Sequence, residues 1–385
     1  MVKDFNQELL EYCSGIRRYL HQNPELSFCE NSSAEFIIRE LQEIGIEGYR
    51  IAKTGVYAIL DSGNPGPLVA IRADIDALPL QEKSSVPYIS KVPGVMHACG
   101  HDGHTAILLG LAKSIIENPI QIKGKLMLLF QPAEETPPGG ALEIIKSGIL
   151  NEADYILGSH LTNQLLLGQI GIRSGNVMAS IDRFSVGITG KGGHGSTPHR
   201  CVDPIIAGAY LVTAWQTIVS RNTDPMEPTV LTTATFTAGS NFNIIPEEAV
   251  ITGSVRSLSE TVRAAIENRF YTITQEVCDA FGVSCEISYE QGYPVLSCCE
   301  GLTDKIKGWF KETFGENMIT EPPMIMWSED FAYYGKKAPI VYFFIGARNE
   351  KRGYIYENHN PQFDFDEEAM LVGINTYRII LKNIE

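Results

Sequence analysis

The sequence lacks the features of several large protein classes. Its apolar runs, such as Leu126–Phe130, fall far short of the ~20 residues that a membrane-spanning helix needs. The first residues, Met1–Glu8, show no apolar core behind a basic start, so we expect no secretory signal and a cytoplasmic protein without membrane contact. Basic residues are also scarce: 31 Lys and Arg against 46 Asp and Glu give a net charge of −15. This balance argues against nucleic-acid binding.

The eight cysteines follow no spacing typical of a known site. The absence of a Cys-x-x-Cys pair excludes a zinc ribbon or a thioredoxin-like motif. Without a secretory signal, reduced thiols are the expected state. The Gly-x-Ser-x-Gly turn of serine hydrolases is missing as well.

What is present is a chain of 385 residues with 44% apolar residues, enough for more than one folded domain. In its first half, helical and strand patterns alternate, which is typical of βαβ units. We therefore predict an α/β domain with a central mixed sheet, largely parallel and covered by helices. The expected helices are 5–20, 32–44, 105–116 and 140–149, and the expected strands are 68–73, 124–130 and 154–158.

The middle of the chain has a different pattern. Asp203 and Pro204 form a typical helix start. The order strand, helix, strand, strand, helix, strand predicts a ferredoxin-like α+β domain inserted into the α/β domain. We expect a first catalytic segment 1–181, the inserted domain 182–293 and a second catalytic segment 294–385. The elements expected from the insertion onward are strands 184–189, 230–238, 249–258, 284–289 and 339–344, and helices 204–220, 261–281, 301–314 and 366–381.

The densest group of reactive side chains is Met96–His104, which contains three His, one Cys and one Asp. Thiolate and imidazole are good ligands for zinc and similar ions. Gly100 permits a tight turn between Cys99 and His101. The alternatives are a His-rich loop that caps a helix and a Cys–His nucleophile pair; spacing alone does not select the ligands.

Acidic pairs follow two of the predicted strands. Glu134 and Glu135 come after strand 124–130, where open α/β sheets place their ligands. One can bind a metal while the other acts as a base. Asp74 and Asp76 follow strand 68–73 and can orient histidine ligands. For both pairs the alternative is a solvated acidic turn.

Other candidates stand alone in the sequence. His160 is expected at a strand exit and His359 in a turn-rich loop, and either can be structural. Glycines around His194 match Gly-x-Gly-x-x-Gly, but no helix opens there, so we reject a dinucleotide site. Asn243 can bind substrate or shape a turn, and Arg256 can pair with a substrate carboxylate or be an ordinary strand-end charge.

Taken together, the motifs resemble the amidohydrolase family of hippurate hydrolases, bacterial aminoacylases, N-acetyldiaminopimelate deacetylases and plant auxin-conjugate hydrolases. The resemblance covers nearly the whole chain. The motifs that carry it are His21-Gln-Asn-Pro-Glu-Leu, Arg72-Ala-Asp-Ile-Asp-Ala-Leu-Pro, Met96-His-Ala-Cys-Gly-His-Asp-Gly-His, Phe130-Gln-Pro-Ala-Glu-Glu, Gly190-Lys-Gly-Gly-His-Gly, Ser220-Arg-Asn, Asn243-Ile-Ile-Pro, Ser328-Glu-Asp-Phe and Pro361-Gln-Phe-Asp-Phe.

The resemblance implies two divalent ions per subunit, of which Zn, Mn, Co and Ni are the candidates. It also implies Glu134 as general base, with Asp74 and Asp76 supporting the site. His194 is expected to reach the substrate carbonyl from the inserted domain of a partner subunit, which implies a homodimer. The implied metal ligands are Cys99, His101, Glu135, His160 and His359.

The expected reaction is hydrolysis of an N-acyl amino acid, such as an N-acetyl or N-benzoyl derivative, to a carboxylic acid and an amino acid. The alternatives are a metal-dependent dipeptidase and a non-catalytic relative that binds acyl-amino acids. Three segments depart from the family pattern and leave the substrate open: Thr136-Pro-Pro-Gly, His160-Leu-Thr and Met326-Trp327.

Overall fold

A computed structural model describes residues 2–385, with side chains from Asn6 onward. The chain forms two compact units. The first contains the residues up to Gly175 together with Ser297–Pro323 and Tyr333–Glu385. The second contains Asn176–Leu296 and the short segment Met324–Ala332, which the sequence analysis does not anticipate.

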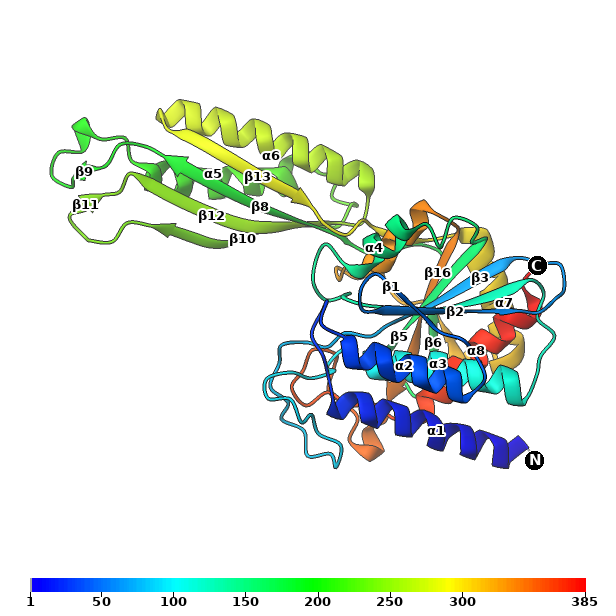
Figure 1. Ribbon diagram of the computed structural model, residues 1–385. Helices are drawn as coiled ribbons and strands as arrows, with labels where there is room; N and C mark the ends of the chain where they lie inside the picture. The colour runs from blue at the N-terminus through cyan, green and yellow to red at the C-terminus, as the bar shows by residue number, and fades with distance from the viewer. Residues whose placement is uncertain (1) are drawn as a thin grey trace. The chain divides into compact units, whose positions relative to one another are not determined.

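The first unit is built on one eight-stranded mixed sheet with the order β1-β2-β4-β3-β5-β16-β6-β15 (Figure 1). The central pairs β4–β3, β3–β5 and β5–β16 are parallel, whereas β1–β2, β2–β4 and β16–β6 are antiparallel. The strands are β1 (Tyr49–Ile51), β2 (Gly55–Asp61), β3 (Leu68–Asp74), β4 (Lys125–Gln131), β5 (Tyr155–Leu166), β6 (Ile170–Ile172), β15 (Ile319–Thr320) and β16 (Ile340–Arg348).

Helices cover both faces of this sheet. In Figure 1, α1, α2 and α3 lie on one face and α4 on the other. Helix α3 is buried along almost its whole length and packs against α1 and α8. The helices are α1 (Val2–Gln22), α2 (Asn31–Glu43), α3 (His101–Glu117), α4 (Gly140–Ser147), α7 (Glu300–Phe314) and α8 (Glu368–Asn383).

The neighbouring strands β3 and β4 explain where a site can form. Both are buried on both faces, as near-continuous apolar strands of a parallel pair are. After β3 the chain continues into α3, and after β4 into α4, which lies on the opposite face (Figure 1). Open α/β sheets bind ligands at the carboxyl ends of strands where the chain diverges in this way.

Two predicted boundaries near the site are wrong. The strand predicted to end at Gly158 continues to Leu166, so His160 lies within β5 and not at its exit. It continues because β16 pairs with β5 over this stretch. The helix predicted to start at Thr105 starts at His101, because Gly100 adopts φ +90° and Asp102 stands in the favourable first turn.

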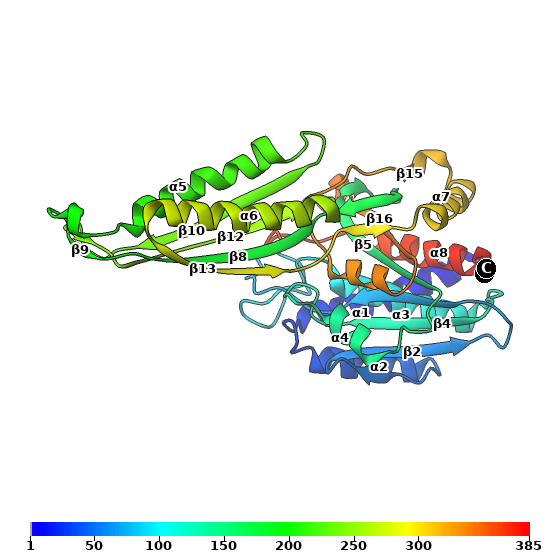
Figure 2. The ribbon, with the colours of Figure 1, turned by 90° about the horizontal axis from the view of Figure 1, so that it is seen from above.

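The second unit contains a four-stranded antiparallel sheet with the order β10-β12-β8-β13 (Figure 2). Two helices pack on it, and Trp215 and Phe270 stack between them with ring centroids 4.7 Å apart. The side chain of Asp203 caps α5, as expected. The main elements are β8 (Ser180–Thr189), α5 (Pro204–Thr217), β10 (Thr229–Ala238), β12 (Glu248–Ser257), α6 (Glu260–Phe281) and β13 (Ser284–Gln291).

Smaller elements complete the two units. The predicted end of α5 near Ser220 is replaced by an end at Thr217 and one π-helical turn, Ile218–Asn222. The borders between the units fall within β7 (Gly175–Met178), within β14 (Leu296–Cys298) and on either side of the segment Met324–Ala332. Within residues 2–385 no helix has both the length and the apolar character to cross a membrane, and the cysteines form no disulfide.

Candidate metal centre

The exit of β3 carries two buried aspartates. Arg72 donates to Oδ2 of Asp74 at 2.7 Å. Burial alone would raise the pKa of Asp74, but His101, His104 and Arg72 hold this pKa well below its usual range. Burial also opposes ionisation of Asp76, yet its contacts with His101 lower that pKa. Both aspartates are therefore buried as carboxylates.

The turn into α3 presents Cys99 and His101 on either side of Gly100. Nδ1 of His101 donates to the backbone carbonyl of Asp76 at 2.9 Å and lies 3.2 Å from its Oδ1. This contact leaves Nε2 of His101 as the available ligand atom. Nε2 is buried and finds no hydrogen-bond partner among residues 2–385.

The exit of β4 carries the two glutamates. The backbone N–H of Glu135 donates to Oδ2 of Asp76 at 3.0 Å. Oε1 of Glu135 is buried and makes no hydrogen bond in the described chain, although Nε2 of His359 lies 3.1 Å away and Nε2 of His101 lies 4.0 Å away. Glu134 is also buried and belongs with His101 and Glu135 to one group of ligand atoms within 4.8 Å of one another.

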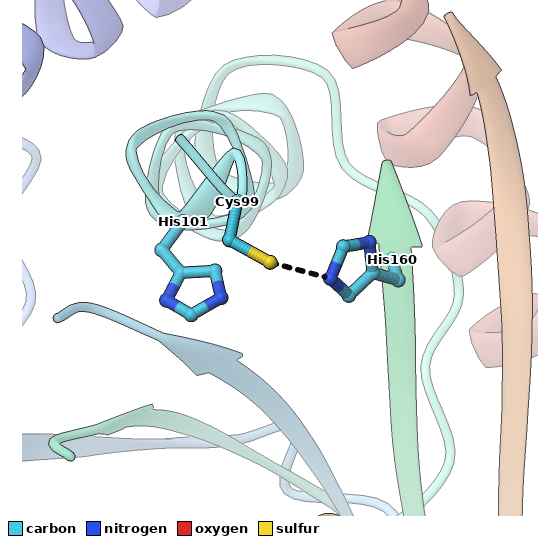
Figure 3. A group of neighbouring side chains, drawn as sticks. All are labelled: Cys99, His101 and His160. Atoms are coloured by element: carbon cyan, nitrogen blue, oxygen red, sulfur yellow. Dashed lines mark hydrogen bonds between the residues drawn. The ribbon is translucent and has the colours of Figure 1, made fainter. Parts of the chain in front are cut away.

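Two further histidines approach the thiol of Cys99. Nε2 of His160 and Nε2 of His359 each lie 3.3 Å from its Sγ, and Figure 3 shows the first of these contacts. Nδ1 of His160 donates to the carbonyl of Leu161 at 2.7 Å, which turns Nε2 toward the thiol. His359 adopts φ +67°, and its backbone N–H donates to the carbonyl of Ala98 at 2.7 Å.

The five expected ligands thus lie together, and their donor set fits divalent cations. A thiol, three imidazoles and a carboxylate are the ligand types of zinc and related ions. They form two trios that share Cys99, one with His101 and His160 and one with Glu135 and His359, each with ligand atoms within 4.8 Å of one another. Two of the buried side-chain atoms that make no hydrogen bond in the described chain, Nε2 of His101 and Oε1 of Glu135, belong to these trios. The residues present therefore fit two ions.

The carboxylates of the cluster favour positive charge beside them, and a bound cation would take the place of the proton on Nε2 of His101. Burial alone would lower the pKa of His101, but Asp74, Asp76 and Glu135 raise this pKa to about 10. Burial and the carboxylates of Glu135 and Glu134 raise the pKa of the Cys99 thiol well above its usual range. A nucleophilic cysteine needs the opposite shift, so the geometry favours Cys99 as a ligand that a cation ionises over a Cys–His nucleophile.

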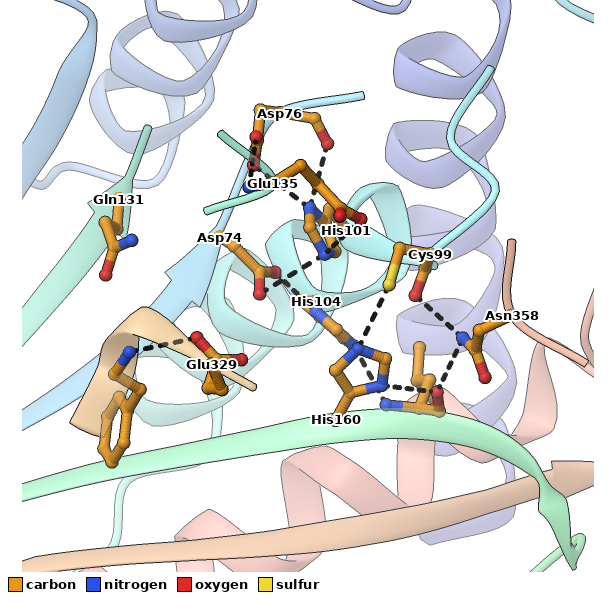
Figure 4. Close-up of polar contacts among 12 residues, drawn as sticks. Asp74, Asp76, Cys99, His101, His104, Gln131, Glu135, His160, Glu329 and Asn358 are labelled. Atoms are coloured by element: carbon orange, nitrogen blue, oxygen red, sulfur yellow. Dashed lines mark hydrogen bonds and ion pairs between the residues drawn. The ribbon is translucent and has the colours of Figure 1, made fainter. Parts of the chain in front are cut away.

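The structure gives roles to two residues for which the sequence analysis assigned none. His104 lies one turn after His101; its Nδ1 donates to Asp74, and its Nε2 accepts from the backbone N–H of Leu161 at 2.9 Å (Figure 4). It thereby joins the exit of β3 to β5, and its spacing of three from His101 was an available signal. Asn358 donates to the carbonyls of Cys99 and Leu161 at 3.0 and 3.2 Å, and no sequence pattern indicated it.

The other predicted site residues lie in the second unit. His194 is exposed on β9 (Gly193–His194), which pairs with β11 (Ile244–Ile245) directly after Asn243. The backbone N–H of Ser196 donates to Nδ1 of His194 at 3.1 Å, so the exposed Nε2 is the ring atom that can carry a proton. Arg256 lies near the other end of β12 and donates to a backbone carbonyl, that of Met326, at 2.7 Å. The structure therefore groups His194 with Asn243 but not with Arg256.

The fold and this set of thiol, imidazole and carboxylate groups define a metal-binding α/β protein with its site at the carboxyl ends of parallel strands. The chain belongs to peptidase family M20/M25/M40, whose model matches residues 70–383.

Three relatives show how close this similarity is. The N-acyl-L-amino acid amidohydrolase of Geobacillus stearothermophilus is 47% identical over 287 residues, covering 74% of this chain and 78% of the relative. Thermostable carboxypeptidase 2 of Saccharolobus solfataricus is 38% identical over 384 residues, covering 98% and 97%. The crystal structure of Bacillus subtilis YXEP, a dinuclear metal binding peptidase, matches with a TM-score of 0.85 and 32% identity over 98% of each chain.

Proposed function

We propose that this protein is a metal-dependent amidohydrolase that cleaves N-acyl amino acids, with N-acetyl and N-benzoyl derivatives as the first candidates. The observation that carries the proposal is the cluster of Cys99, His101, Glu135, His160 and His359 at the carboxyl edge of the sheet, in which Cys99, His101 and His160 are buried, Glu135 is half-buried and His359 is exposed. Relatives named amidohydrolase and dinuclear metal binding peptidase support the reaction type and the metal requirement.

The chain's own residues supply proton transfer and orientation. Bound divalent ions supply Lewis-acid polarisation of an amide carbonyl and an acidified water, and Zn, Mn, Co and Ni are all compatible with the ligands. Glu134, beside the ligand Glu135, is proposed to take the proton of the attacking water and pass it to the leaving amine. Asp76 orients both His101 and Glu135 through its two carboxylate oxygens.

We assign the second unit a role as a ferredoxin-like dimerisation or lid domain. His194 and Asn243 are exposed neighbours, and the Nε2–H of His194 can donate to the oxygen that becomes negative in the transition state. We propose that they serve the metal centre of a partner subunit in a homodimer. If Arg256 binds the substrate carboxylate in the same site, it comes from a different subunit than His194, because Glu248 and Arg256 are eight positions apart, about 26 Å along the strand.

The experiment is a hydrolysis panel. Chelator-stripped protein is reloaded separately with Zn, Mn, Co or Ni and assayed for free amino acid from N-acetyl-, N-benzoyl- and dipeptide substrates. Turnover of acylated amino acids that depends on added metal supports the proposal. No turnover with any ion, with metal bound at this cluster and the fold intact, would favour a binding protein instead.

Peptide cleavage is the second candidate. It is favoured by the 38% identity to Thermostable carboxypeptidase 2 over 98% of the chain. The metal centre would cleave an amide bond in both reactions, so peptide cleavage and N-acyl amino acid cleavage differ only in the groups attached to the two sides of that bond. A kcat/KM for dipeptides that exceeds the values for all N-acyl amino acids would select this candidate.

A further inference from the structure

The loop that carries Glu134 and Glu135 is held at its start by a carboxylate outside the metal cluster. Ala133 has φ +53°, a backbone conformation that few residues other than glycine adopt. Its N–H donates to Oε1 of Glu30 at 2.8 Å. Ala133 and Glu30 are both fully buried, so water does not compete for this bond.

The second oxygen of Glu30 is also occupied. Oγ1 of Thr54 donates to Oε2 of Glu30 at 2.6 Å. Thr54 lies between β1 and β2, and Glu30 directly precedes α2. Glu30 therefore joins three separate segments: the start of α2, the β1–β2 turn and the loop after β4.

The residue on the other side of Glu134 is held in the same way. The backbone N–H of Glu135 donates to Oδ2 of Asp76 at 3.0 Å. Glu134 thus lies between two backbone N–H groups, each bound by a buried carboxylate from a different segment. Asp76 also contacts the ligand His101, whereas Glu30 contacts no ligand side chain that we identify.

We propose that Glu30 is a positioning residue that fixes Ala133 and thereby the directions of Glu134 and Glu135. This proposal rests on the proposed role of Glu134 as proton acceptor. A strained backbone conformation persists only where surrounding contacts over-determine it, and the Glu30 bond is such a contact. Removing the acceptor leaves a buried N–H without a partner and lets the turn relax. A displacement of about 1 Å at a reacting group can cost on the order of a hundredfold in rate.

The variants show whether Glu30 acts as a hydrogen-bond acceptor or through its negative charge. In Glu30→Gln the amide oxygen can still accept from Ala133 while its NH2 group donates to the hydroxyl of Thr54. Glu30→Met has a similar size but no comparable acceptor, and Glu30→Asp keeps the charge but is one methylene shorter. Leu41→Ala is the matched control, because Leu41 is fully buried on helix α2, which Glu30 directly precedes, and does not contribute to the metal centre.

Two measurements are combined. Amide hydrogen exchange of a peptide covering residues 133–136 is followed by mass spectrometry in chelator-treated protein, and kcat and KM are measured with saturating metal. In Glu30→Met we expect faster exchange in this peptide, kcat lower by roughly tenfold to a hundredfold and KM within about twofold. Glu30→Gln is expected to recover slow exchange and most of kcat, and Leu41→Ala to keep the exchange of this peptide and kcat.

A folded Glu30→Met protein with wild-type exchange and kcat would overturn the proposal, as would a Gln variant as impaired as Met. If Glu30→Met does not fold, the comparison of Asp with Gln decides: an impaired Asp variant and a near-native Gln variant support the proposal, and the reverse overturns it. If wild-type protein cleaves no substrate of the panel, the proposed function fails, but the exchange data still decide the role of Glu30.

Discussion

Nε2 of His359 lies 3.1 Å from Oε1 of Glu135, although Glu135 follows β4 and His359 follows β16, far apart in the sequence. Both approach the thiol of Cys99, and His359 Nε2 is 3.3 Å from its Sγ. The buried thiol of Cys99 would have little reason to meet both an imidazole and a carboxylate unless a cation binds them, because a buried thiol beside a carboxylate stays protonated.

Replacing Glu134 with Gln should abolish most turnover while metal binding persists. The amide keeps the size of the side chain but cannot accept a proton from water, and a general base contributes about 10²–10⁴-fold to rate. We expect kcat to fall by at least a hundredfold, with two ions per subunit by elemental analysis. Glu152→Gln, an exposed residue, is the matched control. Wild-type kcat in Glu134→Gln would contradict the assignment of the base.

Replacing Cys99 with Ala should reduce metal occupancy, because both trios of candidate ligands contain Cys99. We expect less bound metal after dialysis and a matching loss of activity that excess metal partly restores. Cys29→Ala, at an exposed thiol, should change neither. A Cys99→Ala protein that is fully loaded but inactive would revive the alternative of a cysteine nucleophile.

A mixed dimer tests whether His194 acts across subunits. A His194→Ala subunit retains Glu134, and a Glu134→Gln subunit retains His194. If His194 serves the partner's centre, the mixed dimer contains one complete site and should show about half of wild-type activity. Each homodimeric variant provides its own inactive baseline. Verified mixed dimers that remain at this baseline would count against action across the interface.

The stability of the first unit should depend on pH through His21. Its Nδ1 lies 2.8 Å from Oδ2 of Asp102 and its Nε2 3.3 Å from Oε1 of Glu82. Burial alone would lower the pKa of His21, but these carboxylates raise it above its ordinary value. Because the folded-state pKa is raised, the stabilisation is fully present below the unfolded pKa of about 6.5 and is lost as pH rises through the folded value.

The measurement is urea unfolding of His21→Gln against wild-type protein at pH 6 and pH 9, with exposed His199→Gln as control. We expect His21→Gln to reduce the free energy of unfolding by about 1.5–3 kcal/mol at pH 6, the usual size for a hydrogen bond to a charged group, and by less at pH 9. An equal loss at both pH values would show that His21 contributes without its charge.

Most long periodic segments of the fold could be predicted, whereas the seven-residue strand β2 and the short edge strands could not. Helices α1, α2 and α6 and strands β3, β4 and β12 lie where apolar spacing predicts them. The short strands β6 and β15 were not predicted, because three or two residues carry no readable period and pairing with a neighbour decides them. The extension of β5 through His160 depends on its pairing with β16, which is far away in the sequence.

The residues of the candidate site also differ in how far the sequence could indicate them. The Met96–His104 cluster could be recognised as a candidate metal site from residues alone, whereas the choice of Cys99 and His101 within it came from the family resemblance. His359 gained significance only from the family resemblance, because a single histidine in a loop carries little information. Glu30 gave no signal, since its role depends on the unusual φ of Ala133 and on a hydrogen bond across the fold.

The origin of the ligands has a consequence for the thermodynamics of the first unit. The five candidate ligands come from four separate segments of the chain between Cys99 and His359, so each bound ion would act as a cross-link that the unfolded chain cannot reproduce. Ligand binding to the folded state alone adds RT ln(1 + [L]/Kd) to stability. The melting temperature of this unit should therefore follow the concentration of free metal, and a chelator should act on it as a selective denaturant.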